Sequence, residues 1–441
     1  MDKDYRKLVV KTLVAFEQSK SRLNLILKPI LNSSNIDSRT RNRTKVVAYE
    51  IIRYKDRFDF IINLVSNRRV DKIDLRLKSI IRLGCYELIF DPLVPDYAAI
   101  NSAVDLTKFF VNNRAASMVN AILQRLNRKV NSDEDWLDSL SRKIEWLSYP
   151  KWLFNKWEKQ FGTSRAVLLC NKYNNPSSMF LRVDVSKQTA DNVIIELEKD
   201  KIKTKKFKLI SNFLIVLDNQ KDVTKNSLFL SGAISIQDPA SAAIIYLLDL
   251  KPGEEILDVC AAPGTKSLLM AEVLKDECII HASDIDPERV RLGINDMGRH
   301  KYSSINWSVL DASKDSMKKV NKILIDAPCT GTGVISKKPD IKWRRSLNDV
   351  STMIRLQYSI LSNTAKYLRK GGVLVYSTCS VENEENSWLI KKFLSKNKNF
   401  SLSKDIGSVP SSWIDKKGFF NTVFVEDAVS GMFAAKLIKS W

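Results

Sequence analysis

The sequence lacks the features of a membrane-spanning, metal-binding or disulfide-stabilised protein. No apolar run reaches the roughly 18 residues that a membrane-crossing helix needs, and the N-terminal stretch MDKDYRKLVV has no apolar signal-peptide core. The chain has 2 histidines and 6 cysteines, and no two cysteines form a C-x-x-C pair. We therefore expect a soluble, cytoplasmic protein that holds no metal and is kept under reducing conditions.

Acidic residues are scarce relative to basic ones. The 441 residues include 71 Lys and Arg against 50 Asp and Glu, which gives a formal net charge of +21. Such a surface attracts a nucleic acid or an anionic membrane, although a lysine-rich genome composition gives the same count without any function. The length predicts two or three domains, and the hydrophobic content of 44% is typical of globular chains.

Alternating strand patterns are rare in the first part of the chain and frequent in the last part. Residues 1–130 have apolar positions at helical spacing, which predicts an all-helical domain. Residues 131–149 predict a linker helix, and residues 150–235 predict a small α+β module of short strands around one helix. Strands and helices alternate in residues 236–441, so we expect a Rossmann-like α/β domain there.

The predicted α/β domain lacks the G-x-G-x-x-G fingerprint that cradles the diphosphate of a dinucleotide. Its first strand is followed instead by CAAPGTK, in which Gly264 is the single glycine, and the next two strands end at Asp284 and Asp311. A carboxylate at such a strand end can accept hydrogen bonds from both hydroxyls of a ribose. We predict an adenosine-containing cofactor without a diphosphate; the alternative is that each aspartate only caps a turn or helix.

Two cysteines follow the fourth and fifth predicted strands of this domain. Cys329 comes directly after Pro328 in DAPCTG, and Cys379 lies in STCS. Because parallel strands present their carboxyl ends at one edge of a sheet, both thiols are expected beside the predicted cofactor. The alternative is that both are core residues, since unpaired cysteine is among the most buried residue types.

These motifs resemble a known family. LDVCAAPGTKS, DAPCTGTG and YSTCSVENEEN are similar to the motifs of the RNA cytosine-5 methyltransferases that use S-adenosyl-L-methionine. The N-terminal stretches RTRNRTKVVAYEIIRYKDRFD and IIRLGCYELIF resemble a NusB-type helical domain. The fusion of the two, which covers essentially the whole chain, resembles the bacterial 16S rRNA (cytosine-5) methyltransferase B family.

The resemblance implies a function and a set of roles. Cys379 would be the nucleophile, Cys329 would assist release of the adduct, and Asp326 would hold a proton near cytosine N3. The substrate would be 16S rRNA or an assembly intermediate of the small subunit, and we expect a monomer. The residues implied for cofactor binding are Cys260, Ala261, Ala262, Pro263, Gly264, Lys266, Asp284, Asp311 and Asp326.

The chemistry explains why two thiols are useful. Carbon 5 of cytosine is a poor nucleophile, but a thiolate added to carbon 6 makes the ring enamine-like, so that carbon 5 can attack a sulfonium methyl group. The adduct must then be broken, which requires removal of the carbon 5 proton. An ordinary thiol has a pKa of about 8.5, so Cys379 needs surroundings that favour the thiolate.

A basic stretch follows the DAPCTG motif. We predict that it contacts RNA beside the site, because a basic segment with an aromatic ring suits a backbone and an extruded base; the alternative is a solvated loop. The predicted contact residues are Lys337, Lys338, Lys342, Trp343, Arg344 and Arg345.

The sequence departs from the family pattern at two places, and two other functions are compatible with its motifs. Thr265 replaces the second glycine of the usual cofactor loop and would be strained if that position needed a positive φ. Residues 429–433 also depart from the usual pattern, although the C-terminal stretches still predict an antiparallel hairpin. One rival is another adenosine-cofactor enzyme, such as an amino-group methyltransferase, a dehydrogenase or a methyltransferase for another RNA. The second rival is a non-catalytic RNA-binding or antitermination module.

Overall fold

The computed structural model describes residues 4–32, 36–66 and 68–440. The chain forms two compact units, which we describe separately. The helical unit comprises residues up to Asn175 together with Lys338–Arg345, and the sheet unit comprises Pro176–Lys337 and Ser346 onward. A short segment of the C-terminal half of the sequence therefore belongs to the N-terminal unit.

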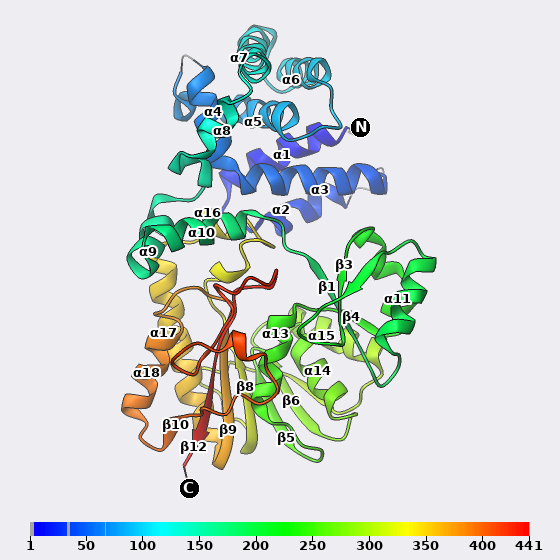
Figure 1. Cartoon of the computed structure of the whole chain (residues 1–441), viewed down its shortest axis with the longest axis vertical. Helices are drawn as coiled ribbons and strands as arrows, with labels where there is room; N and C mark the ends of the chain where they lie inside the picture. The colour runs from blue at the N-terminus through cyan, green and yellow to red at the C-terminus, as the bar shows by residue number, and fades with distance from the viewer. Residues whose placement is uncertain (1–3, 33–35, 67, 441) are drawn as a thin grey trace. The chain divides into compact units, whose positions relative to one another are not determined.

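The helical unit contains no strand in its described residues, as the sequence predicted (Figure 1). Several helices begin at a polar side chain that accepts a backbone N–H, including Asp4, Asp37, Asp74 and Asn112. The helices are α1 (Tyr5–Gln18), α2 (Leu23–Leu31), α3 (Ser38–Arg53), α4 (Lys55–Val65), α5 (Leu75–Ile89), α6 (Asp96–Phe110), α7 (Asn113–Ser132), α8 (Trp136–Ser141), α9 (Lys151–Phe161), α10 (Thr163–Asn174) and α16 (Ile341–Arg344).

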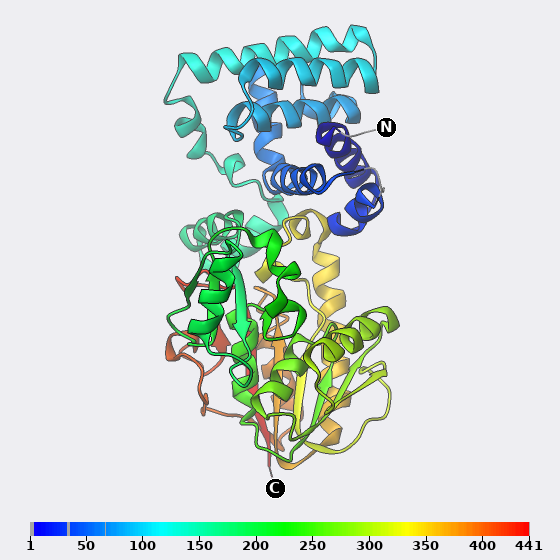
Figure 2. The ribbon, with the colours of Figure 1, turned by 90° about the vertical axis from the view of Figure 1, so that its right-hand side faces the viewer.

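The core of the helical unit comes from the apolar stripes of these helices. Val9 and Leu13 of α1 are buried with Ile80 and Ile81 of α5, and α6 packs beside α7 (Figure 2). Arg82 is buried among these apolar groups but is bonded to the carboxylates of Asp59 and Glu17. The unit thus combines an apolar interior with buried charges that have partners.

The sheet unit begins with a small antiparallel sheet of order β2-β3-β1-β4. Its strands are β1 (Met179–Val183), β2 (Thr204–Lys206), β3 (Phe213–Val216) and β4 (Ile234–Ile236), with α11 (Ala190–Lys199) and α12 (Ser227–Leu230) between them. Alternate residues of β1 point to different cores: Phe180 joins one cluster, whereas Leu181 and Val183 pack under α11. The predicted α+β module is therefore present.

The larger sheet of this unit has the order β10-β12-β9-β8-β5-β6-β7, with β11 paired to β12. The five strands β9, β8, β5, β6 and β7 are parallel, and β12 is antiparallel to β9. The strands are β5 (Glu255–Val259), β6 (Ile279–Asp284), β7 (Ile305–Val309), β8 (Val320–Asp326), β9 (Leu368–Thr378), β10 (Phe400–Leu402), β11 (Phe420–Asn421) and β12 (Phe433–Lys439). The predicted C-terminal antiparallel hairpin is confirmed.

Helices cover both faces of this sheet (Figure 1). Leu324 of β8 packs on the side of α14 (Thr265–Val273), whereas its neighbours Ile323 and Ile325 pack on the side of α17 (Leu347–Thr364) and α18 (Ser387–Lys396). The face of α14 also receives α13 (Pro239–Ala243) and α15 (Pro287–His300). This is the doubly wound arrangement that the alternation of strands and helices predicted.

None of the helices in the described residues is long and apolar enough to cross a membrane.

Candidate active site

The carboxyl ends of the parallel strands lie side by side at one edge of the large sheet. Val259 of β5 is in register with Ser283 of β6 and with Ile325 of β8, and Asp326 of β8 is in register with Ser377 of β9. The loop after β5 therefore lies between Asp284 and Asp326, and the turn after β8 lies next to the end of β9. The sheet brings the predicted cofactor loop and both predicted thiols to one edge.

The two thiols are in direct contact. The Sγ atoms of Cys329 and Cys379 are 3.3 Å apart, and both residues are half-buried. The hydrogen bond between the thiols and the burial of the site raise the pKa of Cys329 well above its ordinary value, and the negative charge of Glu385 adds to this shift. Cys329 therefore keeps its proton at neutral pH.

The loop after β5 is shaped by two residues with positive φ. Cys260 has φ 58° and Gly264 has φ 100°. A side chain at Gly264 would also meet Trp307, because a Cβ atom there would lie 2.6 Å from the indole. Thr265 is the first residue of α14 and has no positive φ, so the strain that we considered for this departure does not arise.

Asp284 holds this loop from the neighbouring strand. Its buried carboxylate accepts the backbone N–H of Ala262 at 3.2 Å and that of Asp286 at 3.1 Å. The guanidinium of Arg289 lies 3.0 Å from the same carboxylate. Asp311 is half-exposed in the turn after β7, where its carboxylate accepts from Ser313 and its pKa is lowered by these hydrogen bonds.

A series of side-chain hydrogen bonds connects the predicted cofactor loop to β8 and β9. The ammonium of Lys266 lies 2.6 Å from Asp326 Oδ2, and the hydroxyl of Ser377 donates to Asp326 Oδ1 at 3.0 Å. Burial by itself lowers the pKa of Lys266, but the charge and hydrogen bond of Asp326, together with the charges of Asp258 and Cys379, outweigh burial and raise it. A proton-carrying group is thus held directly beside Asp326.

Sequence reasoning missed two buried carboxyl groups of this site. Asp258 of β5 is fully buried, and burial raises its pKa to about 7. Glu385 follows β9, is also fully buried, and accepts hydrogen bonds from both thiol turns. Both lie inside the quoted motifs LDVCAAPGTKS and YSTCSVENEEN. Glu382 of the second motif is fully buried as well, and the sequence gives no sign of which glutamate of the run bonds to the thiol turns.

The predicted RNA-contact segment lies in the helical unit, except for Lys337. RNA contact was a wrong prediction for Lys342, which is fully buried and donates to Arg53 O at 2.7 Å and Asn174 Oδ1 at 3.0 Å. The indole N–H of Trp343 donates to Ile52 O, and the ring packs against the helical core. Arg344 donates to two carbonyl groups and stacks on Phe16 at 3.5 Å. Lys342 stabilises the helical unit because its side-chain nitrogen donates to two acceptors that are distant in sequence, and burial lowers its pKa well below the ordinary value.

The remaining predicted contact residues differ among themselves. Lys337 donates to the carboxylate of Asp238 in the sheet unit, Lys338 is exposed, and Arg345 is half-buried.

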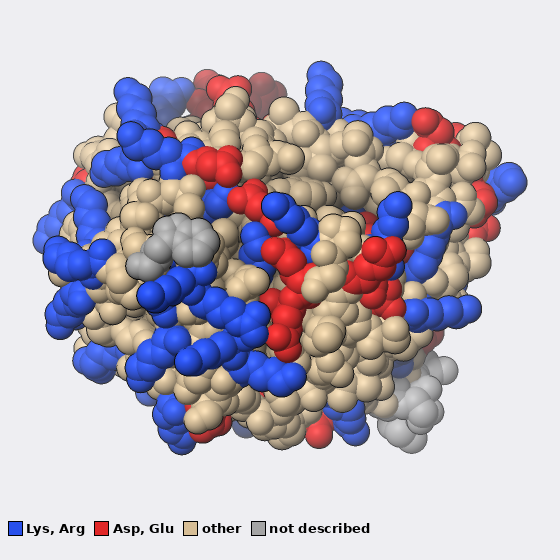
Figure 3. All heavy atoms as spheres, turned by 90° about the horizontal axis from the view of Figure 1, so that it is seen from below, with Lys and Arg blue, Asp and Glu red and all other residues tan. Residues whose placement is uncertain are grey.

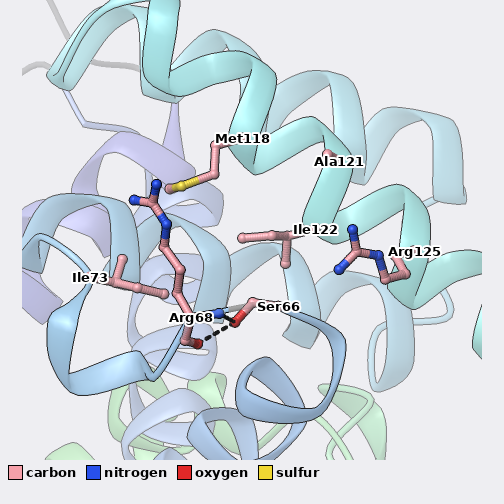
Figure 4. A pocket seen from close by; sticks show the side chains of 7 residues that line it. All are labelled: Ser66, Arg68, Ile73, Met118, Ala121, Ile122 and Arg125. Atoms are coloured by element: carbon pink, nitrogen blue, oxygen red, sulfur yellow. Dashed lines mark hydrogen bonds between the residues drawn. The ribbon is translucent and has the colours of Figure 1, made fainter.

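Two hollows lie among the described residues of the helical unit and are lined by its own side chains. The larger, of about 580 Å³, lies between α2 and α3 and is lined by Asn24, Leu27, Lys28, Leu31, Asn32, Arg41, Lys45 and Tyr49. We call it the α2–α3 groove; no carboxylate lines it, and Lys28 and Lys45 are exposed without an ion pair to any described residue. The smaller, of about 140 Å³, lies beside α7 and has an apolar lining of Ile73, Met118 and Ile122 with Arg68 and Arg125 at its rim (Figure 4).

Comparison with known proteins assigns the class of the chain. The profile described as 16S rRNA methyltransferase RsmB/F matches residues 245–438, and the NusB family profile matches residues 3–128. A ferredoxin-like domain of the RsmF/B-like methyltransferases matches residues 149–224. The sheet unit therefore carries a methyltransferase domain, and the helical unit carries a NusB-type domain.

Relatives cover most of the chain. The probable ribosomal RNA small subunit methyltransferase B of Bacillus subtilis is 30% identical over 400 residues, which span 90% of this chain and 89% of the relative. Its counterpart in Shewanella oneidensis is 32% identical over 81% of each chain. The chain belongs to the ribosomal RNA small subunit methyltransferase B family.

Solved structures show the same fold. The structure of PH0851 covers the whole of both chains with a TM-score of 0.79 at 23% identity. A methyltransferase homologue from Pyrococcus horikoshii, 27% identical, matches 69% of this chain and 98% of its own with a TM-score of 0.56.

Proposed function

We propose that this methyltransferase transfers a methyl group from S-adenosyl-L-methionine to carbon 5 of a cytosine in 16S rRNA, with Cys379 as the nucleophile. The observation that carries the proposal is the contact between two thiols, 3.3 Å apart, at adjacent strand ends beside the cofactor loop. Methylation of an exocyclic amine needs no thiol, whereas methylation of carbon 5 needs one to activate the ring and a route to release it. The names of the relatives support small-subunit rRNA as the substrate.

The carboxyl groups around the loop fit this cofactor. Asp258, Asp284 and Asp326 bring three carboxyl groups to the strand ends on both sides of residues 260–266. Asp284 is paired with Arg289 and Asp326 with Lys266, so the loop is not strongly negative. The carboxylates instead offer hydrogen-bond acceptors to the ribose hydroxyls and to the ammonium group of the cofactor. S-adenosyl-L-methionine supplies the electrophilic methyl group that the activated base accepts. Asp284 would bind the ribose hydroxyls, and the remaining loop residues would enclose the cofactor.

The chain's own groups perform the remaining steps. The Cys379 thiolate adds to carbon 6 of cytosine as N3 takes up a proton, and Asp326, whose carboxylate is bonded to the ammonium of Lys266, would hold that proton at N3. After methylation, a base takes the proton from carbon 5 and the bond between carbon 6 and Cys379 breaks. The electrons of the carbon 5–hydrogen bond restore the double bond between carbons 5 and 6, and Cys379 leaves as a thiolate. Cys329, which keeps its proton, lies 3.3 Å from this sulfur and would stabilise the departing thiolate by a hydrogen bond, without giving up the proton.

The helical unit is proposed to hold the rRNA through the α2–α3 groove. Lys28 lies on α2, and Arg41, Lys45 and Tyr49 form an i, i+4, i+8 stripe on α3, so cations line both sides of the hollow. Phosphates would contact the cations, and Tyr49 offers a ring for a base. Figure 3 shows another face of the molecule, on which Lys and Arg are most frequent over the left part and Asp and Glu lie nearer the middle.

The test is to incubate the protein with unmodified 16S rRNA and methyl-labelled S-adenosyl-L-methionine and to identify the labelled nucleoside. We expect 5-methylcytidine with the wild-type protein and none with Cys379→Ala. Cys329→Ala is expected to accumulate a covalent protein–RNA adduct, which denaturing gel electrophoresis detects. Label in another nucleoside would overturn the proposal; no label on naked rRNA but label on an assembly intermediate would correct only the substrate.

The rival functions give different results in the same experiment. An amino-group methyltransferase labels an exocyclic nitrogen and does not depend on Cys379. A dehydrogenase binds a nicotinamide cofactor instead of S-adenosyl-L-methionine. A non-catalytic RNA-binding module binds rRNA and gives no label with any substrate.

A further inference from the structure

Glu385 is a buried carboxylate that lies between the two thiol turns. Its side chain is 0% exposed, and four donors use its two oxygens. Oε2 accepts the backbone N–H of Thr330 at 2.9 Å and the amide of Gln357 at 2.8 Å. Oε1 accepts the hydroxyl of Ser380 at 2.7 Å and that of Thr330. The acceptor positions of the carboxylate are thus fully occupied.

The residues bonded to Glu385 are the sequence neighbours of the thiols. Thr330 directly follows Cys329, and Ser380 directly follows Cys379. Gln357 of α17 also donates to Pro328 O at 2.9 Å, so the residue before Cys329 is held as well. The backbone carbonyl of Glu385 accepts the hydroxyl of Tyr376 at 2.8 Å, which attaches the glutamate to β9.

Because Glu385 is a buried carboxylate, its hydrogen bonds strongly restrict the positions of both thiol turns. A carboxylate in a water-excluded site is costly unless every acceptor position is filled, and hydrogen bonds to a charged group are about twice as strong as neutral ones. Displacing either turn would leave part of the carboxylate without donors. The conformations that satisfy Glu385 are therefore those in which both turns, and both sulfurs, keep their present positions.

We propose that Glu385 is a positioning residue that holds Cys329 and Cys379 at their contact distance by bonding to the residue after each thiol. Its negative charge also raises the pKa of Cys329 and so favours the thiol form there. The consequence for methylation rests on the proposed function; the consequence for the spacing of the thiols does not.

Thiol crosslinking tests the spacing without any RNA. Diamide oxidises two adjacent thiols to a disulfide, and mass spectrometry of the Cys329–Cys379 peptide pair measures the rate in the full-length protein. We expect Glu385→Ala to slow this rate about tenfold, since disulfide geometry tolerates little displacement. Glu385→Gln should stay within about twofold of wild type, because its amide oxygen can serve Thr330 N and Gln357 while the two hydroxyls turn to accept from its NH₂.

Glu272→Gln is the matched control. Glu272 is a buried carboxylate of the same unit that bonds to Arg182 and has no hydrogen bond to either thiol turn. This variant should lower the melting temperature without changing the crosslinking rate. If Glu385→Ala fails to fold, Ser380→Ala and Thr330→Val, which each remove one donor, replace it, and each is expected to slow crosslinking.

Methylation kinetics complete the test. Glu385→Ala should lower kcat about 100-fold while KM for S-adenosyl-L-methionine stays near wild type, because the thiols and not the cofactor loop are displaced. Crosslinking of Glu385→Ala at the wild-type rate, or equal slowing by Glu272→Gln, would overturn the positioning role. Slow crosslinking in Glu385→Ala with no 5-methylcytidine from wild type would reject the proposed function and leave the positioning role standing.

Discussion

In the sheet unit, the ionisable residues of the site follow strands at a single edge, whereas in the helical unit similar residues are divided between the interior and the surface. Asp284, Asp326 and Cys379 owe their places to the ends of β6, β8 and β9. Lys342 and Lys45 both belong to helices of the helical unit, yet one is fully buried and the other is exposed. The end of a strand therefore places a residue at the site through its own segment of the sequence. Whether a lysine on a helix is buried or exposed depends instead on the elements that pack against it.

The strongest way to test this comparison is to remove the buried lysine, Lys342, whose pKa burial lowers well below its ordinary value. We expect Lys342→Ala to lower the free energy of unfolding by about 4 kcal/mol, because it leaves two buried acceptors unpaired and a void beside Tyr149. Urea unfolding of the whole protein, followed by tryptophan fluorescence, measures the effect. Lys338→Ala, an exposed residue of the same segment, should change stability by less than about 0.5 kcal/mol.

Two results would contradict the structural role of Lys342. Unchanged stability in Lys342→Ala would mean that its buried hydrogen bonds contribute little. Unchanged stability together with weaker rRNA binding would restore the original prediction that this segment contacts RNA.

The sheet unit contains a buried charge with the opposite effect. Asp258 Oδ2 accepts the hydroxyl of Ser267 at 2.6 Å, but Oδ1 has no hydrogen-bond partner in the described part of the chain. Burial raises its pKa from an ordinary 3.8 to about 7, so ionisation destabilises the folded state. The destabilisation is absent below about pH 4, grows as the pH rises toward 7, and is complete above pH 7.

Asp258→Asn sharpens the comparison by removing this charge. The shift corresponds to at most about 4 kcal/mol, of which we expect about 2 kcal/mol after relaxation of the site. Asp258→Asn should therefore melt at a higher temperature than wild type at pH 8 and at nearly the same temperature at pH 4. An equal difference at both pH values would mean that Asp258 does not titrate with a raised pKa.

The parts of the protein that the sequence predicted share a physical basis. The parallel strands, the terminal hairpin and the thiol turns follow from apolar runs and the residues after them, because strand ends meet at one edge. The contact between Cys329 and Cys379 follows from the pairing of β8 with β9. Local patterns suffice where topology brings neighbouring segments together.

The features that the sequence did not predict depend on distant contacts. Lys342 is buried because carbonyl and amide groups from α3 and α10 surround it, and no local pattern encodes this. Glu385 is one of three glutamates in VENEEN, and only the turns around it distinguish it. The α2–α3 groove is formed by residues from two helices, Leu27, Lys28 and Leu31 of α2 and Arg41, Lys45 and Tyr49 of α3, and neither helix by itself has a pattern that predicts it.

Charge reversal in the α2–α3 groove is expected to have the smallest effect on free energy. Lys28→Glu with Lys45→Glu should weaken binding to rRNA about tenfold, which is about 1.4 kcal/mol, and reduce the salt dependence of binding by about two counterions, roughly one for each lysine. Stability should stay within about 0.5 kcal/mol, since both side chains are exposed. Filter binding at several salt concentrations measures both quantities.

The control for the groove is a second double variant with the same net charge as Lys28→Glu with Lys45→Glu. Lys143→Glu with Lys151→Glu changes two exposed lysines of the same unit that do not line the groove. If rRNA binding depends only on net charge, both double variants weaken it equally and the groove has no special role. If only the groove variant weakens binding, and its melting temperature matches that of Lys143→Glu with Lys151→Glu, the position of the cations decides. The helical unit would then use its exposed cations for RNA and its buried ones for folding, a division that net charge alone does not reveal.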